Sequence, residues 1–177
     1  MNRRRWFFYV IALLAGSTRV FSKESLRIVP IVNEDEVLVS FELADAYTAG
    51  VREAISSGLR TTFTYYLDVR MLAPFWMDRS IVTVVVSTTD QYDNLTRRHI
   101  LTRTLDGQVV ETLVTEDESV VGRWLTTFVR LPLCRTSRLE PGREYYLRIN
   151  ARSRPHADSL LGWANSITGQ TKFTFVP

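Results

Sequence analysis

The stretch from residue 60 to residue 72 alternates regularly between apolar and polar side chains. Successive side chains of a β-strand point to opposite faces of the sheet, so a period of two predicts a strand with one buried face and one wet face. The apolar set is Phe63, Tyr65, Leu67, Val69 and Met71, and the polar set is Thr62, Thr64, Tyr66, Asp68 and Arg70. Strands of this kind are typical of antiparallel sheets.

Most of the remaining chain has the same character. Short apolar or alternating runs are separated by turn signals such as Asp106-Gly107 and Pro141-Gly142, which favour consecutive hairpins. The predicted strands are 29–31, 37–43, 60–72, 80–89, 95–104, 108–115, 143–151 and 172–176, and residues 152–170 are predicted to form a long loop. The sequence therefore predicts a mainly β fold, an antiparallel β-sandwich in which an immunoglobulin-like arrangement is one option, with an open β-barrel as the alternative.

Two segments change from a period of two to helical spacing. Residues 48–58 predict a short helix that ends at Gly58, because glycine suits the position just after a helix. A second helix is predicted to begin at a capping box formed by Thr115 and Glu118. Its apolar positions recur as far as Val129, and Pro132 is expected to end it.

The N-terminus has the pattern of a secretory signal peptide. Three arginines precede an apolar run of about ten residues, and small residues follow it. This run is too short for a membrane-spanning helix, which needs ~20 apolar residues. We expect residues 1–22 to be the signal peptide, with cleavage after Ser22 or, alternatively, after Ser17. An uncleaved signal that holds the chain at the membrane and a buried N-terminal helix are the other readings. Residues 23–177 are predicted to form one β-sandwich domain without a transmembrane span.

Removal of the signal peptide changes the charge of the protein. The full chain has 22 basic and 19 acidic residues and a net charge of +3. Four of the basic residues and none of the acidic ones lie in 1–22, so the remaining chain has 18 basic and 19 acidic residues. A nucleic-acid partner is therefore not expected, because phosphate binding needs a basic surface.

The chain contains no recognisable catalytic, metal-binding or nucleotide-binding motif. The two histidines and the single cysteine lie in different predicted elements, whereas zinc sites need three or four ligands in paired spacings. His99 is interpreted as a polar residue on the face of its strand, and Cys134 as a buried thiol. The acidic run 116–118 is interpreted as the start of a helix, where carboxylates complement the dipole. No cofactor, no metal and no enzymatic activity are predicted.

Several blocks of residues, in order along the chain, resemble the bacterial family known as domain of unknown function 4390. The blocks are Ser57-Gly58-Leu59 with Phe63-Thr64-Tyr65, Trp76-x-Asp78, Tyr92-Asp93-Asn94-Leu95-Thr96-Arg97-Arg98, Leu139-x-Pro141-Gly142-x-x-Tyr145-Tyr146-Leu147-Arg148 and Phe173-Thr174-Phe175-x-Pro177. The resemblance implies an exported, β-rich envelope protein, and it implies a link to a nitrogen-regulation-type sensor histidine kinase, beside which some members are encoded. It assigns no active-site residue.

The family blocks contain six residues with two interpretations. They are Trp76, Asp78, Tyr92, Asp93, Arg97 and Arg98. In the first interpretation they maintain the structure, since an Asp in a turn commonly accepts hydrogen bonds from its own backbone. In the second they form a patch that docks a partner, because Tyr, Trp and Arg anchor many interfaces.

Three functions follow, in order of preference. The first is a non-enzymatic interaction module with a protein partner in the cell envelope, either in the periplasm or on the periplasmic face of the inner membrane if the signal is uncleaved. The second is a periplasmic carrier for a small ligand or lipid, which needs an apolar cavity of ~300–1,000 Å³ between the sheets. The third is an enzyme that uses His99, Asp93 and Arg97. The sequence determines neither the partner nor the oligomeric state.

Overall fold

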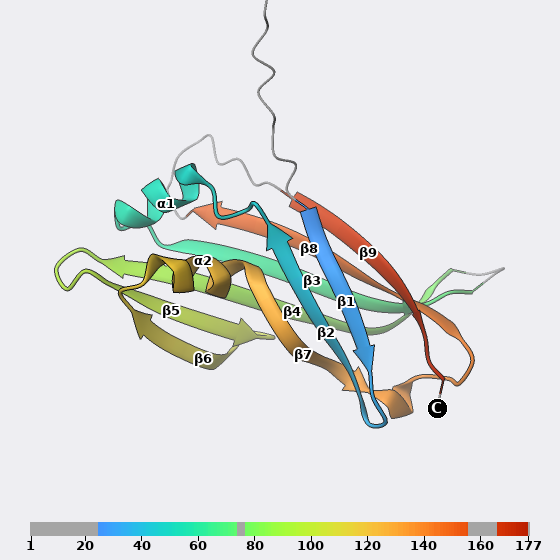
Figure 1. Ribbon diagram of the computed structural model, residues 1–177. Helices are drawn as coiled ribbons and strands as arrows, with labels where there is room; N and C mark the ends of the chain where they lie inside the picture. Colours follow the sequence, from blue (N-terminus) through green and yellow to red (C-terminus); the bar gives the residue numbers. More distant parts are fainter. Residues whose placement is uncertain (1–24, 74–76, 156–165, 177) are drawn as a thin grey trace, which may run out of the picture.

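A computed structural model describes residues 25–73, 77–155 and 166–176 of the chain as two packed layers of antiparallel strands and two helices (Figure 1). The small sheet has the order β1-β2-β7 and the large sheet the order β6-β5-β4-β3-β8-β9. The strands of the small sheet are β1 (Ser25–Val32), β2 (Glu36–Ala44) and β7 (Thr127–Arg135). Those of the large sheet are β3 (Thr61–Met71), β4 (Arg79–Asp93), β5 (Arg98–Leu105), β6 (Gln108–Thr115), β8 (Glu144–Pro155) and β9 (Ser166–Thr174). The predicted mainly β sandwich is confirmed.

The period of two in residues 60–72 forms β3, at the centre of the large sheet between β4 and β8. Its apolar set faces inward, and Phe63, Tyr65, Leu67 and Val69 are all at most 1% exposed. The polar set faces outward, where Thr62 and Thr64 form hydroxyl pairs with Thr89 and Ser87 of β4. One face of the sheet is thus core and the other is wet, as predicted.

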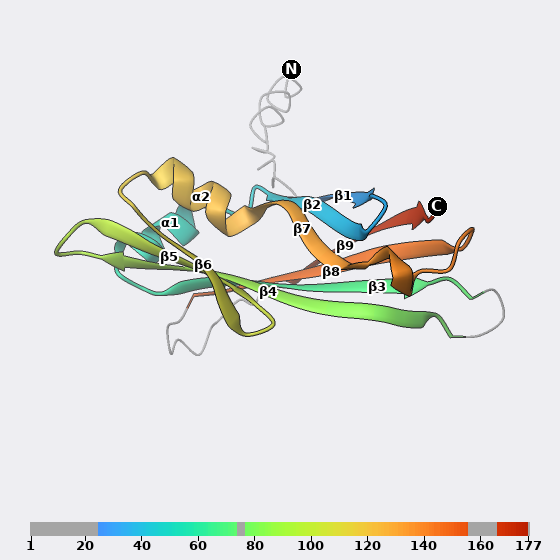
Figure 2. The same cartoon turned by 90° about the horizontal axis from the view of Figure 1, so that it is seen from below.

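The inner face of the large sheet is covered by the small sheet together with helices α1 (Ala49–Ser56) and α2 (Glu118–Thr126), which lie on the same side (Figure 2). At the other edge, β1 packs directly on β9. A Cβ placed on Gly169 of β9 would lie 2.9 Å from Leu26 Cδ2 and 3.1 Å from Ile28 Cδ1. A residue without a side chain at this position allows the close approach of the two layers.

The second helix ends earlier than its apolar spacing predicts. The helix ends at Thr126, and the chain continues directly as strand β7. The prediction of a helix as far as Val129, ended by Pro132, is therefore wrong for these residues. Phe128 belongs to this strand and stacks on Phe41 of β2 with a ring-centroid distance of 4.4 Å. Pro132 is tolerated in β7 because the strand lies at the edge of the small sheet.

Side chains of the large sheet hold the end of α2 in place. The last carbonyls of a helix have no partner within the helix. Leu125 O accepts hydrogen bonds from the Tyr65 hydroxyl at 2.6 Å and from Thr88 Oγ1 at 3.1 Å. Trp124 O accepts one from the Arg103 guanidinium at 3.4 Å. These donors come from β3, β4 and β5, so the change from helix to strand depends on the large sheet.

Other boundaries also differ from the prediction. The N-cap of α2 is Asp117, whose carboxylate accepts from the Ser119 amide at 2.8 Å, and Thr115 is still part of β6. β8 extends to Pro155 and β9 begins at Ser166, so the predicted loop 152–170 is too long at both ends. The signal peptide, Trp76 and residues 156–165 lie outside the described part of the chain. Within the described part, no helix has the length and apolarity needed to cross a membrane.

The hydrogen bonds to Leu125 O predict a non-additive pair of variants. Tyr65→Phe and Thr88→Val should each lower the free energy of unfolding by about 1 kcal/mol, because one donor remains in either case. The double variant should lose more than the sum, since the buried carbonyl then has no donor. Urea unfolding measures both terms. Tyr66→Phe, on the wet face of the same strand, is the control and should change stability by less than about 0.5 kcal/mol. Strict additivity would contradict the role assigned to this carbonyl.

Candidate functional site

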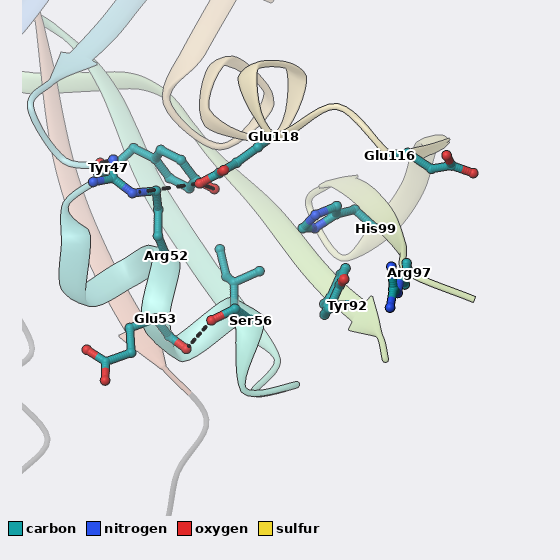
Figure 3. Close-up of a pocket in the computed structure, with 10 residues that line it drawn as sticks. Tyr47, Arg52, Glu53, Ser56, Tyr92, Arg97, His99, Glu116 and Glu118 are labelled. Carbon is teal, nitrogen blue, oxygen red and sulfur yellow. Dashed lines mark hydrogen bonds and ion pairs between the residues drawn. The ribbon is translucent and has the colours of Figure 1, made fainter. Parts of the chain in front are cut away.

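A pocket of about 440 Å³ opens at the end of the molecule where α1, the β4–β5 turn and the start of α2 meet (Figure 3). Arg97, Tyr92 and His99 lie on one side of it, and Tyr47, Arg52 and Glu118 lie on the other. The residues that line it are Tyr47, Arg52, Glu53, Ile55, Ser56, Tyr92, Arg97, His99, Glu116 and Glu118. They come from segments that are far apart in the sequence.

Helix α1 is fixed against the β4–β5 hairpin at its C-terminal end. Gly58 follows the helix with φ +85° and closes it through a hydrogen bond from its amide to Ile55 O at 2.8 Å. This confirms the predicted role of Gly58, since such a conformation favours glycine. Gly58 O also accepts from Gln91 Nε2 at 3.3 Å, and a Cβ on this glycine would lie 2.9 Å from the side-chain nitrogen Nδ2 of Asn94. The turn and the helix therefore hold each other at the pocket rim.

Tyr47 connects the two helices across the pocket. Its ring packs against Gly122 of α2: a Cβ added to this glycine would lie 3.0 Å from Tyr47 Cδ1. Its hydroxyl donates to Glu118 Oε1 at 3.5 Å, and Arg52 lies 3.7 Å from the same oxygen. Burial, and then the negative charge of Glu118, raise the pKa of Tyr47 to about 12. The phenol therefore stays protonated and serves as a donor at neutral pH.

Behind the opposite wall lies a buried carboxylate–imidazole pair. Asp90 of β4 is 0% exposed and His99 of β5 is 8% exposed. Asp90 Oδ2 lies 2.8 Å from His99 Nδ1, and the His99 ring packs on Tyr92 with a centroid distance of 4.6 Å. Asp90 holds Nδ1, so Nε2 is the nitrogen left for the pocket, where it has no partner among the described residues. His99, interpreted as a polar residue on the face of its strand, shares its face of β5 with Leu101, as the alternation predicts, and that face is buried.

The electrostatics of this pair are unusual for a β-sheet core. Burial raises the pKa of Asp90, and its hydrogen bond and charge interaction with His99 oppose that shift. Asp90 Oδ1 is buried without a hydrogen-bond partner in the described part of the chain. A buried carboxylate of this kind is stabilised chiefly by its one partner, so the orientation of the imidazole and the ionisation of the acid depend on each other.

The turn that carries Arg97 is held by Asp93. Asp93 Oδ1 accepts from the amides of Leu95 at 2.9 Å and Thr96 at 3.4 Å, and Oδ2 accepts from Thr96 Oγ1 at 2.8 Å. These bonds, led by that of the Thr96 side chain, lower the pKa of Asp93. Arg97 follows with φ +57°. Its guanidinium makes no hydrogen bond or ion pair with any residue that the structure describes.

The model of the family described as domain of unknown function 4390 matches residues 22–157 of the chain, which include every residue of the pocket. The chain belongs to this family. Searches of curated proteins and of solved structures found no match.

In this member of the domain of unknown function 4390 family, the five family-block residues that the structure describes do not form one patch. Tyr92 and Arg97 line the pocket together. Asp93 fastens the turn, and Arg98 pairs with Glu116 at 3.0 Å. Asp78 lies at the opposite end of the 15-residue strand β4, where it accepts from the Ala73 amide at 3.4 Å and from the Tyr146 hydroxyl at 2.9 Å. Trp76 is outside the described residues. Among the five of these residues that the structure describes, the structural interpretation fits Asp78, Asp93 and Arg98, and the docking interpretation applies to Tyr92 and Arg97.

Sequence reasoning missed Asp90, Tyr47 and Arg52. Alternation along β4 could have identified Asp90. Val84, Val86 and Thr88 occupy inward positions of this strand, and Asp90 is the next residue in the same series. The uninterrupted β-branched run of this strand hid the alternation. Tyr47 and Arg52 reach the pocket only through the packing of α1, which no spacing in the sequence reports.

The described residues contain no group of three or more His, Cys, Asp or Glu side chains that could hold a metal ion. What the pocket offers instead is one unpaired guanidinium, one oriented imidazole nitrogen and an aromatic surface. On the α1 side, the carboxylate of Glu53 also has no ion-pair partner among the described residues.

The Asp90–His99 pair predicts a pH-dependent loss of stability. His99→Ala leaves a buried carboxylate without its partner, so it should lower the free energy of unfolding at neutral pH by about 3–5 kcal/mol. Without the imidazole, only the burial that raises the pKa of Asp90 remains. The variant should therefore recover stability as the pH falls through that raised pKa, because the neutral acid tolerates burial. Urea unfolding from neutral to acidic pH follows this recovery.

The matched control for His99→Ala is the double variant with Asp90→Asn. The amide carries no charge, so it should restore most of the loss at neutral pH and remove the pH dependence. A loss that does not depend on pH, or that Asp90→Asn fails to reduce, would contradict the role assigned to the pair.

Proposed function

We propose that this chain is an exported, non-enzymatic interaction module of the cell envelope that docks a protein partner at the pocket around Arg97 and His99. The observation that carries the proposal is Arg97. It is held in an unfavourable backbone conformation, it lines the pocket, and its charge has no partner among the described residues.

The backbone of Arg97 makes a structural role a poor explanation for this residue. A left-handed conformation costs a residue with a Cβ about 1–2 kcal/mol, and Gly or Asn adopts it more easily. Strained residues cluster at sites where the side chain has a function. The positive φ of Asp106 has an ordinary explanation, because Asp-Gly is the preferred sequence of a tight hairpin turn. Arg97 ends the four-residue turn between β4 and β5, where Gly or Asn would adopt the left-handed backbone at lower cost, so the presence of an arginine there supports a role for its guanidinium.

His99 provides a second point of contact. Its ring is fixed by Asp90 on one side and by Tyr92 on the other, so Nε2 is presented at the pocket wall without freedom to reorient. A fixed group loses little entropy on binding. Arg97 would donate N–H groups to a carboxylate, and such charge-assisted bonds are the stronger kind, while His99 Nε2 would add a polar contact beside them.

The charges of the pocket therefore favour a partner with an acidic side chain. Glu116 and Glu118 are already paired, with Arg98 and with Arg52 and Tyr47 respectively. The Arg97 side of the pocket is left positive, and Glu53 leaves the α1 side negative. A volume of about 440 Å³ has room for more than one side chain. The family resemblance supplies a membrane sensor kinase as the first partner to test.

The carrier alternative has less support. The described cavity nearest the space between the layers, lined by Leu43, Phe63 and Ala151 among others, has a volume of about 70 Å³. Small-molecule sites usually have ~300–1,000 Å³. The aromatic rings of Phe41, Tyr65 and Phe128 fill the centre of the core, with centroid distances of 4.4–5.2 Å.

Catalysis by His99 also has less support than docking. Asp90 orients the imidazole as in many enzymes, but a nucleophile has to share a hydrogen bond with the free nitrogen. The two hydroxyls of the pocket wall other than Tyr92 donate elsewhere: Ser56 Oγ to Glu53 O at 3.0 Å and Tyr47 to Glu118. Asp93, which the enzyme hypothesis included, is engaged in its own turn.

Export predicts a defined mature chain. Expression of the full sequence in a bacterial host should deliver a protein that is released with the periplasmic fraction and begins at Lys23. N-terminal sequencing and fractionation measure this. A protein that sediments with the inner membrane and retains residues 1–22 would indicate the uncleaved signal, and a full-length protein in the cytoplasm would contradict export.

Arg97→Asn should separate stability from binding. Asparagine adopts the left-handed backbone more easily, so the variant should be more stable than the wild type by up to about 1 kcal/mol. It should also weaken capture of the partner by ~10-fold or more, as expected for the loss of a charged anchor. Thermal unfolding measures the first effect, and cross-linking of partners in cells followed by mass spectrometry measures the second.

The matched control is Arg98→Asn, one residue further along. Arg98 is paired with Glu116 at the surface, and exposed pairs contribute little. This variant should change neither stability nor partner capture appreciably. If Arg97→Asn captures the same proteins as the wild type at the same yield, the docking proposal is wrong.

A further inference from the structure

In the part of the chain that the structure describes, the two sheets have four edge strands, and three of them carry Pro or Lys, which natural proteins use against edge-to-edge pairing. β1 contains Pro30, and β7 contains Pro132 together with Arg130 at φ +53°. β9 carries Lys172 and is covered by β1 at Gly169. Among the described edge strands, only β6 contains none of Pro, Gly, Lys and Arg; its protection is limited to Glu111 and to one bulge in its first half.

Strand β6 is also the most exposed strand of the described structure. Seven of its eight residues are exposed on both faces of the sheet, and Thr115 is half-buried. Five of the eleven large hydrophobic side chains that are exposed in the described residues lie on β5 and β6: Ile100, Val109, Val110, Leu113 and Val114. Single exposed apolar residues are common, but such a concentration on one edge indicates a contact surface.

The edge of β6 presents little charge to a partner. Its one charged residue is Glu111, whose carboxylate is neutralised by Arg103 of β5 at 2.9 Å. The guanidinium of Arg103 is fixed in turn over the Trp124 ring, at 4.4 Å from the centroid. A strand that approaches β6 therefore meets unpaired backbone groups and β-branched or apolar side chains.

The segment of β6 next to the pocket is a regular ladder. A bulge interrupts the pairing with β5 between Arg103 and Thr104, and the extra residue lies on β6. From Glu111 to Thr115 the register with β5 has no shift. Five residues at this end can accept another strand without distortion.

We propose that β6 of a second copy of this chain pairs antiparallel with β6, across a two-fold axis at Leu113. A two-fold axis perpendicular to the sheet leaves each side chain on the same face in both copies. Residues that lie opposite each other must then be both odd-numbered or both even-numbered, with one residue on the axis opposite its own copy. An axis at Glu111 would place two carboxylates opposite each other. An axis at Leu113 places Leu113 against Leu113 and Thr112 against Val114, and it sets Glu111 against Thr115. The pairing is self-complementary and uses only the regular segment.

A second copy fits β6 because each molecule supplies the same free edge with the same twist and the same apolar pattern. Main-chain hydrogen bonds would join the two large sheets into one, with Ile100 and Val114 of both copies on the outer face. The docking proposal depends on Arg97 and His99, which are not part of β6. The dimer can therefore be tested independently of the docking proposal.

Sedimentation or light scattering of the mature chain tests the inference. We expect a dimer that Val114→Lys converts to a monomer, with a circular dichroism spectrum unchanged from the wild type. Val129→Lys is the matched control, because Val129 is 75% exposed on the protected edge β7. This variant should remain dimeric. Two results would overturn the inference. One is a wild-type chain that is monomeric at every concentration measured, which would leave β6 free for a strand of another protein. The other is a dimer that persists in the Val114→Lys variant.

A cysteine pair tests the register. Cys134 is the single cysteine of the chain, so Cys134→Ser gives a background without thiols. In that background, Leu113→Cys should form an intermolecular disulfide under mild oxidation, and Val129→Cys should not. Equal cross-linking at both positions would indicate random collision and would contradict pairing at β6.

Discussion

The packing of the two layers depends on hydrogen bonds to the backbone carbonyl of Leu125. This carbonyl lies near the end of α2 and accepts from Tyr65 of β3 and from Thr88 of β4, while Arg103 of β5 bonds the neighbouring carbonyl. Three strands of the large sheet thereby end one helix. The chain then enters β7, which completes the small sheet and brings Phe128 onto Phe41. The aromatic core and the position of α2 over the sheet follow from this arrangement.

The same arrangement positions the pocket. Because α2 is held at its C-terminal end, its N-terminal end faces α1, and Glu118 meets Tyr47 and Arg52 there. The β4–β5 hairpin reaches beyond both helices and carries Arg97 at its tip, with the Asp90–His99 pair in its stem. A hairpin with a strained tip and a buried charged pair is less stable than an apolar one of the same length.

Periodicity predicted the sheet well and the surroundings of the pocket poorly. Inward and outward faces of β3 follow from local alternation, and the hairpin 108–115 follows from Asp106-Gly107. The end of α2 does not, because Val129 continues a helical pattern that only hydrogen bonds from distant strands interrupt. The alternation placed His99 on the same strand face as Leu101, but it did not show that this face is buried; the strand also begins at Arg98, because residues up to Arg97 form the turn.

The sequence by itself determined that the chain forms an antiparallel sandwich with two helices, since alternation and turn residues act over a few positions and need no distant partner. It also carries the family blocks that place the chain in the domain of unknown function 4390 family. Only the tertiary structure decided which polar residues meet. Asp90 and His99 pair because β4 and β5 are in register, and Tyr92 and Arg97 share a pocket because α1 packs on their turn. Contacts between elements depend on packing, which no local spacing records.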